Sequence, residues 1–388
     1  MQKVMEYIMR ILHTADWHLG KTFRKVSLMD DQRHVLDQIF DAVVEHDIQV
    51  LIVAGDIYDK QAPSEAAVAL FCRFIERVYV ETDAAIVIIA GNHDSGQRLA
   101  GPAKLYDRNR ILIRGALERD EHPIVLDDDH GAVAFSALPY GEIFAARRTF
   151  EDEAIKSPED VLKREVDAAR ALKPEGARWV IVAHAFVTGG LPSETERTLS
   201  VGTVETVSSS LFDGADYVAL GHLHRPQTAG KESIRYSGSP LAFGFDEADT
   251  TKTMTLFDLA ADGSLEDFRE IAFEPLRKVR EVKGLMADLV AEAENAPSED
   301  YISAILLDEG AVVEPAAQLR PYYPNILQTL REKKRELVHA SAGRAHSKLD
   351  DPMGVISEFV EFVRGEKPNE AETGVVTQIV DQPVQEKL

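Results

Sequence analysis

The chain has 388 residues, 45% of them hydrophobic and 28% charged, and this ordinary globular usage argues against a fibrous, collagen-like or disordered protein. Its 43 Lys and Arg against 66 Asp and Glu give a net charge of −23, which excludes a polybasic protein that coats nucleic acid or anionic lipid through its overall field. The single cysteine, Cys72, rules out an intramolecular disulfide and a multi-thiolate metal site, and we expect it to be a small buried residue of a helix.

Short β-branched runs alternate with longer amphipathic stretches over the first 275 or so residues, a pattern typical of a layered α/β or α+β domain. Apolar residues at three- and four-residue spacing predict helices over 35–44 and 68–78. Strands are expected at the apolar runs 10–12, 50–54, 85–90, 132–138, 179–183, 217–220 and 254–259. The N-terminus lacks the apolar core of a secretory signal, and the run 84–91 is too short to span a bilayer, so the sequence predicts a soluble, cytoplasmic protein without a membrane partner.

The character of the chain changes near Pro275, where a basic stretch is followed by an Ala- and Glu-rich segment. Helical spacing of apolar residues then predicts helices over 325–340 and 352–364, and the last twenty or so residues contain too few apolar side chains to predict a packed structure. The expected domains are a catalytic domain over 9–275, a small capping domain over 276–320, a helical segment over 321–366 and a disordered tail over 367–388.

Five polar clusters each follow directly after one of the expected strands. They are Asp16-Trp17-His18, Gly55-Asp56, Gly91-Asn92-His93-Asp94, His184 and Gly221-His222-Leu223-His224. A single Asp or His at a strand end is more often a turn former or a satisfied hydrogen-bonding residue. Ligands and catalytic groups gather at the carboxyl ends of strands, however, so five such clusters in chain order predict one convergent site. The other histidines keep a structural or surface interpretation, and His13 is expected to face the core.

Imidazole nitrogens together with carboxylate and amide oxygens form a mixed ligand sphere that suits manganese, iron or zinc better than an all-oxygen magnesium site. The candidate ligands are Asp16, His18, Asp56, Asn92, His184, His222 and His224. They are too many for one tetrahedral zinc but fit two ions if one carboxylate bridges them, and Asp56 is the natural bridge because Gly55 allows a sharp turn there. Two ions about 3.5–4 Å apart are the arrangement that hydrolyses phosphoesters, since they clamp the phosphate and lower the pKa of a bound water.

The set Asp-x-His, Gly-Asp-x-x-Asp, Gly-Asn-His-Asp, His and Gly-His-x-His resembles the calcineurin-like metallophosphoesterase superfamily, whose fold is a β-sandwich of two sheets flanked by helices. Longer strings are similar to the SbcD family, the nuclease subunits of bacterial SbcCD complexes. These strings are Ile11–Lys21, Gly91–Leu99, His184–Gly190, Gly221–Pro226 and Arg235–Ala242. The resemblance covers nearly the whole catalytic region and, more loosely, the C-terminal half.

The resemblance implies a role for each residue of the clusters. Two divalent ions, most often Mn²⁺ in this family, would share Asp56: one held also by Asp16, His18 and His224, the other by Asn92, His184 and His222. His93 would face the scissile phosphate and protonate or stabilise the leaving oxygen, which agrees with the need of a leaving alkoxide for an acid. We expect Asp94 to orient His93 or cap the following turn, whereas Asp59 fits a loop residue and a supporting residue equally well.

The resemblance further implies a DNA exonuclease and endonuclease that acts on duplex ends, hairpins and single strands in repair and recombination. Its partner would be the SbcC ATPase subunit, with two nuclease subunits forming a homodimer within a heterotetramer. Two alternatives stay open: a phosphodiesterase or phosphatase for a small molecule or protein, and a non-catalytic scaffold with a structural metal centre. Phosphatases of this superfamily typically carry Arg-Gly after Gly-Asp-x-x-Asp, where this chain has Lys60-Gln61.

Two further surfaces each allow a functional and a structural interpretation. Clustered basic residues are candidate DNA phosphate contacts or simply a solvated face. They are Arg24, Lys25, Arg108, Arg110, Arg147, Arg148, Arg277, Lys278, Arg280 and Lys283. Apolar stripes in the C-terminal part predict helices that either pack on their own domain or, as the family resemblance implies, dock on the coiled-coil base of SbcC.

Overall fold

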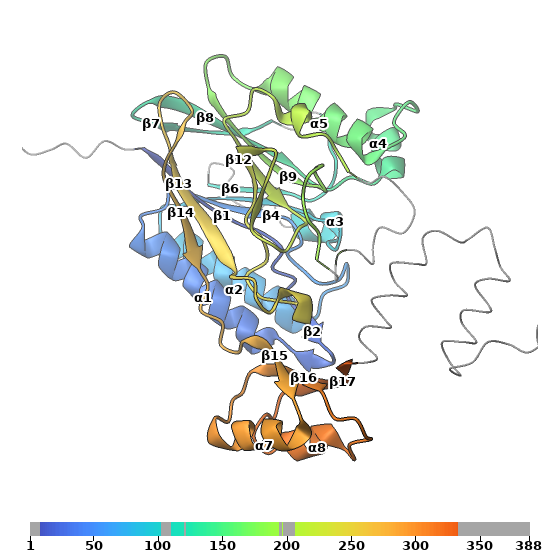
Figure 1. The fold of residues 1–388 in the computed structure, drawn as a ribbon. Helices are drawn as coiled ribbons and strands as arrows, with labels where there is room; N and C mark the ends of the chain where they lie inside the picture. Colours follow the sequence, from blue (N-terminus) through green and yellow to red (C-terminus); the bar gives the residue numbers. More distant parts are fainter. Residues whose placement is uncertain (1–7, 102–109, 120–121, 194–195, 197–205, 333–388) are drawn as a thin grey trace, which may run out of the picture. The chain divides into compact units, whose positions relative to one another are not determined.

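The structure is a computed structural model that describes residues 8–101, 110–119, 122–193, 196 and 206–332 (Figure 1). The chain divides into two compact units, Met1–Arg280 and Glu281–Leu388. This division lies close to the boundary expected at Pro275.

Two six-stranded sheets form the first unit. The first sheet has the order β14-β13-β1-β4-β5-β6, with β1 Met9–Thr14, β4 Val50–Ala54, β5 Ala85–Ile89, β6 Ile111–Arg114, β13 Thr253–Leu259 and β14 Leu265–Ala272. The second has the order β11-β12-β10-β9-β8-β7, with β7 Ile124–Asp128, β8 Gly131–Leu138, β9 Arg178–His184, β10 Tyr217–Gly221, β11 Gln227–Ala229 and β12 Lys231–Tyr236. All the strands expected from the apolar runs are confirmed. The central strands of each sheet run parallel, so their carboxyl ends meet at one edge.

The main core lies between the two sheets. It joins buried residues of the first sheet, such as Ile52 and Val87, to Phe135 and Val180 of the second. His13 also lies here, as expected, with its Nδ1 3.0 Å from the Tyr217 hydroxyl across the core, and burial lowers the pKa of this histidine to about 3. The arrangement confirms the predicted β-sandwich.

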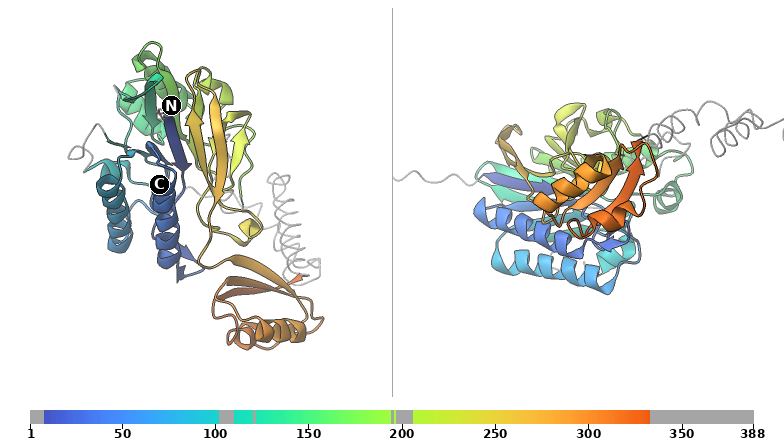
Figure 2. Two further views of the ribbon diagram at one scale, coloured as in Figure 1. Left: turned by 90° about the vertical axis from the view of Figure 1, so that its left-hand side faces the viewer. Right: turned by 60° about the horizontal axis from the view of Figure 1, so that its bottom comes forward.

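Helices flank both sheets (Figures 1 and 2). Beside the first sheet lie α1 (Met29–Glu45) and α2 (Glu65–Glu81), and beside the second lie α4 (Ile143–Phe150) and α5 (Pro158–Leu172). Among the described residues this unit also has the short elements β2 Thr22–Phe23, β3 Val26–Ser27, α3 Gly96–Ala100 and the 3₁₀ turns Ser209–Phe212 and Phe245–Glu247. Cys72 is exposed on α2, so the expectation of a buried cysteine is wrong: Phe71 and Phe74 carry the buried stripe, and Cys72 falls between them on the outer face.

The second unit has a three-stranded sheet, β15-β16-β17, with its own apolar core. Its elements are β15 Val279–Gly284, which begins two residues before the boundary of the unit, α7 Met286–Asn295, β16 Tyr301–Leu306, α8 Pro315–Leu319 and β17 Ile326–Arg331. The helix expected over 325–340 is wrong over 326–331, because this segment pairs parallel with β16 and a short apolar run fits either period. Residues 333–340, the helix expected over 352–364, the tail 367–388 and Arg108 lie outside the described residues.

Candidate metal centre

The structure brings together all seven side chains proposed as ligands at the carboxyl ends of β1, β4, β5, β9 and β10. Backbone hydrogen bonds tie the first two clusters to each other: the Asp16 N–H donates to the Gly55 carbonyl at 3.0 Å, and the His18 N–H donates to the Asp56 carbonyl at 2.9 Å. The loops after β1 and β4 therefore form one connected platform.

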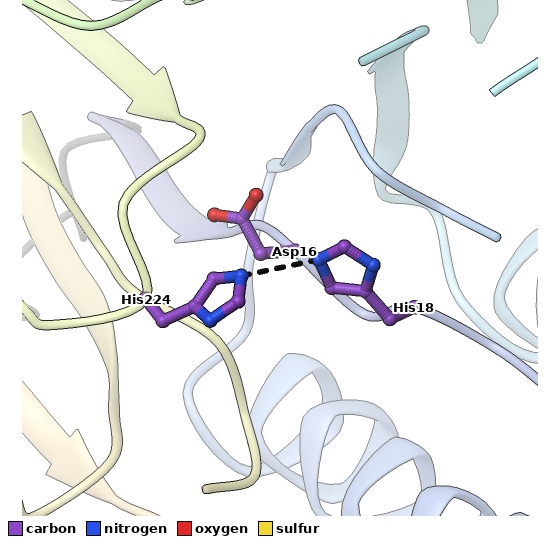
Figure 3. A group of neighbouring side chains, drawn as sticks. All are labelled: Asp16, His18 and His224. Atoms are coloured by element: carbon purple, nitrogen blue, oxygen red, sulfur yellow. Dashed lines mark hydrogen bonds between the residues drawn. The ribbon is translucent and has the colours of Figure 1, made fainter. Parts of the chain in front are cut away.

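One group consists of Asp16, His18 and His224, which are all buried (Figure 3). The Nε2 atoms of the two histidines are 3.2 Å apart, and the Asp16 carboxylate accepts the His222 backbone N–H at 3.0 Å. Two imidazole nitrogens that share one ion at about 2.0–2.1 Å stand roughly 3 Å apart, so the observed separation is that of a ligand pair.

A second group lies around the Asn92 amide. Its Oδ1 is 2.9 Å from His184 Nε2 and 3.1 Å from His222 Nδ1. The other ring nitrogen of His184, Nδ1, donates to the Ala54 carbonyl at 2.9 Å, and this bond fixes the tautomer that leaves Nε2 as the ligand atom.

Asp56 lies between the two groups. Its Oδ2 is 3.6 Å from His18 Nε2 and 3.5 Å from His184 Nε2, while Oδ1 accepts the His93 backbone N–H at 2.9 Å. A Cβ at Gly91 would lie 2.2 Å from this Oδ1, so only glycine allows the approach of the two loops. Asp56 is thus within reach of both groups. Asp16 also comes within 4.8 Å of Asp56 and His184, but its carboxylate accepts the His222 backbone N–H.

Several residues of the site have a left-handed backbone, which side chains other than glycine adopt rarely. The φ angles are 55° at Asp16, 45° at His18, 49° at Asp56 and 106° at His222. Such conformations cost on the order of 1–3 kcal/mol each and persist where surrounding contacts enforce them. These backbone conformations form sharp turns at the strand ends, and the turns direct the side chains toward the carboxyl ends of the two sheets.

The electrostatics of the site favour divalent cations. Burial and the neighbouring Asp56 charge raise the pKa of Asp16 well above its usual value. Burial, together with neighbouring imidazoles, lowers the pKa of His18 and lowers that of His222 to about 3, so both rings are neutral with a lone pair to donate. Neutral imidazoles beside crowded carboxylates are the donor set of a metal site, and these residues fit two divalent ions.

His93 borders the site without belonging to either group. Its Nδ1 lies 3.0 Å from the Asp59 carbonyl oxygen, to which it donates, and this leaves Nε2 for a substrate. Its ring stands edge-to-face on His18 with centroids 4.8 Å apart. The Asp59 carboxylate pairs with Lys21 at 2.7 Å, so the structure favours a supporting role for it.

Asp94 uses its carboxylate to connect the loops after β4 and β5 and not to bind an ion. Its carboxylate accepts the backbone N–H groups of Ile57, Tyr58 and Gly91 at 2.9–3.0 Å. Burial and the Asp56 charge raise the pKa of Asp94 to about 7. This agrees with the expected turn-capping role.

Three charged residues around His224 were not found by sequence reasoning. Lys252 Nζ donates to the His224 carbonyl at 2.8 Å and pairs with Glu247 Oε2 at 2.6 Å, while Glu247 Oε1 lies 3.4 Å from His224 Nδ1. Glu196 accepts the His224 backbone N–H. Burial opposes ionisation of Glu247, but Lys252 and His224 outweigh it and lower the pKa of this carboxyl. No motif spacing marks these residues, because they meet His224 only through the fold.

Replacing Lys252 by Met is expected to weaken Mn²⁺ binding at the His224 group by about 10- to 100-fold, because this cluster orients a ligand. It should also lower the free energy of unfolding of the metal-free protein by roughly 3–5 kcal/mol, since Glu247 is left buried without its cation. Calorimetric Mn²⁺ titration and urea unfolding measure both effects. The matched control is Lys231→Met, which breaks an exposed pair with Asp213 and should change stability by at most about 1 kcal/mol. Unchanged metal affinity in Lys252→Met would rule out the orienting role.

The basic residues proposed to contact DNA divide into two kinds. Arg24 and Lys25 are exposed at the turn between β2 and β3, and Arg148 is exposed on α4. Arg147 Nε donates to the Ile155 carbonyl at 2.6 Å, and Arg277 pairs with the buried Asp31 at 2.7 Å. The guanidinium groups of Arg147 and Arg277 are therefore engaged within the protein, which gives both residues a structural role. Of the two basic residues that follow Arg277, Lys278 is exposed and Arg280 is half-buried.

In the part of the chain that the structure describes, no helix is both long and apolar enough to cross a bilayer. Among solved structures, the chain is similar to GAP50, the anchor in the inner membrane complex of Plasmodium, with 12% identity and a TM-score of 0.38 over 69% of this chain and 90% of that one. The model of the calcineurin-like phosphoesterase family matches residues 9–226, more than half of the 388 residues and every polar cluster up to His224. The chain belongs to the calcineurin-like phosphoesterase family.

Proposed function

We propose that the chain is a two-metal DNA nuclease, an SbcD-type subunit that works with an SbcC ATPase in DNA repair and recombination. As a calcineurin-like phosphoesterase it is a metal-dependent hydrolase of phosphoester bonds. The observation that carries the proposal is the position of Asp56, 3.6 Å from His18 and 3.5 Å from His184, with the His93 backbone on its other oxygen. Two ligand groups that share one carboxylate are the arrangement expected of a phosphodiester hydrolase with two ions.

The chain's own residues divide the work. Asp16, His18 and His224 would hold one ion, Asn92, His184 and His222 the other, and Asp56 both. Two divalent ions, Mn²⁺ by family resemblance, would when bound polarise the phosphate and lower the pKa of a water molecule. His93 in its protonated form gives the Nε2 proton to the leaving alkoxide, while the Asp59 carbonyl holds the opposite edge of its ring.

DNA is the proposed substrate because the strings around the clusters resemble SbcD and because exposed Arg24 and Lys25 offer phosphate contacts. The net charge of −23 opposes tight binding by the chain alone, so we propose that stable DNA engagement needs the SbcC partner and a second nuclease subunit. The compact second unit is the proposed cap, and it includes β17, which belongs to the first part of the segment 321–366 that we propose docks on SbcC. The remainder of that segment, 333–366, lies outside the described residues.

The test is Mn²⁺-dependent cleavage of end-labelled duplex and hairpin DNA, measured beside methyl p-nitrophenyl phosphate, with and without the SbcC ATPase. We expect cleavage of both DNA substrates, faster with the ATPase present, and loss of cleavage with a chelator. Hydrolysis of the generic diester without any DNA cleavage would contradict the nuclease and favour a small-molecule phosphodiesterase.

A further inference from the structure

A cavity of about 590 Å³ opens directly beside the second ligand group. Asn92, His184 and His222 line one end of it. Its other walls come from the loop after β8, the starts of α4 and α5 and the loop after β9. The volume is that of a small-molecule site, about 300–1,000 Å³. Nothing in the proposed metal chemistry accounts for a space of this size.

Aromatic side chains continue outward from the ligand histidines along this cavity. The Tyr140 ring stands edge-on to His184 with centroids 6.4 Å apart, and the Phe186 ring is tilted on His222 at 6.2 Å. Phe144 also lines the cavity and is 76% exposed, so the core does not require its ring. Aromatic faces beside a phosphate site are the surfaces on which nucleobases stack.

The charges of the lining indicate what kind of group can enter. Glu142 and Glu165 line the cavity together with Lys156, so two carboxylates stand against one ammonium. This balance disfavours a second phosphate or another anion. It suits an uncharged planar group whose edge carries N–H donors and whose faces are apolar.

We propose that this cavity binds the nucleobase of one of the two nucleotides that flank the scissile phosphodiester, with Tyr140, Phe144 and Phe186 as its stacking residues. The inference rests on the proposed nuclease function and adds a base-binding subsite to it. The base enters from the Asn92 side while its phosphate lies at the ligand groups. Stacking on aromatic rings accepts any base, so the subsite positions the strand without reading its sequence.

Thymidylyl-thymidine tests this subsite, because its single phosphodiester defines the bond that is cleaved. Abasic analogues replace the 5′ or the 3′ thymidine by a tetrahydrofuran residue, and kcat/KM is measured with Mn²⁺ on the full chain. We expect removal of one of the two bases to lower kcat/KM by about 5- to 150-fold. Tyr140→Ala and Phe144→Ala should shrink this ratio towards one, and Tyr140→Phe should preserve it. Val80→Ala, which truncates a residue 72% exposed on α2, is the control.

A second readout needs no turnover. A 2-aminopurine placed at the end of a short oligonucleotide should lose fluorescence on binding to full-length His93→Ala loaded with Mn²⁺, which is expected to keep its metals with little turnover, and adding Tyr140→Ala or Phe144→Ala should restore it. DNA cleavage with equal rates on intact and abasic substrates would overturn the subsite and leave the nuclease standing. A base preference or quenching that both alanine variants retain would also overturn it. Hydrolysis of methyl p-nitrophenyl phosphate without cleavage of DNA or the dinucleotide would overturn the nuclease, and the subsite with it.

Discussion

Replacing Asp56 by Ala or Asn is expected to abolish tight metal binding and phosphodiester cleavage together. Its Oδ2 lies 3.6 Å from His18 and 3.5 Å from His184, so this one oxygen is within reach of a histidine of each group. We expect kcat/KM to fall by more than the roughly 10- to 100-fold typical of losing an outer hydrogen-bond partner of a ligand. Asp56→Asn keeps an oxygen for the His93 backbone N–H, and therefore separates loss of the bridge from loss of the fold.

Manganese stoichiometry by calorimetry and the rise in melting temperature on adding Mn²⁺ measure the binding, and cleavage of labelled DNA measures the activity. Asp127→Ala, at an exposed position of β7, is the matched control and should behave as the unaltered protein. Two tightly bound ions in Asp56→Asn would show that the two groups do not share this carboxylate.

Replacing His93 by Ala is expected to keep both metals and to lower kcat by about 10²- to 10⁴-fold, the usual contribution of a general acid. The residue donates its Nδ1–H to the Asp59 carbonyl at 3.0 Å and belongs to neither ligand group around Asp56. It is partly exposed, so removing its ring does not open the core. The loss should depend on the leaving group, because an acid assists a poor one most.

The decisive comparison is DNA against methyl p-nitrophenyl phosphate. A deoxyribose alkoxide needs a proton and p-nitrophenolate does not, so His93→Ala should slow DNA cleavage far more than hydrolysis of the aryl ester. His122→Ala, at an exposed histidine between β6 and β7, serves as control. Equal losses on both substrates, or lower manganese stoichiometry, would assign His93 to the ligands or to the fold.

Much of the fold could be predicted because the central strands β4 and β5 are uninterrupted apolar runs, buried along their whole length. Such runs, as in Val50–Ala54 and Ala85–Ile89, predict buried strands from the sequence alone. The convergence of the polar clusters on one site could also be predicted, because residues that follow parallel strands lie at the same edge of a sheet.

What could not be predicted depends on contacts between distant parts of the chain. Glu247 and Lys252 follow β12 in the chain and contact His224 only in the folded protein. No local sequence pattern predicts these contacts. The segment 326–331 became a strand because β16 offered it a partner, which a helical reading of three apolar residues cannot anticipate. The aromatic cavity likewise joins Tyr140 to Phe186 from two separate loops.

Few of the chain's acidic residues belong to the proposed metal centre. Only Asp16 and Asp56 of the acidic residues belong to the proposed ligand set, so the rest of the acidity lies elsewhere in the protein. The charge that argued against nucleic acid at first thus becomes an expectation of weak DNA binding by the isolated chain.

Anomalous diffraction from crystals grown with Mn²⁺ tests the two-metal centre most directly. We expect two manganese peaks about 3.5–4 Å apart, one beside Asp16, His18 and His224 and the other beside Asn92, His184 and His222, with Asp56 touching both. A single peak, or two peaks without Asp56 between them, would contradict the account.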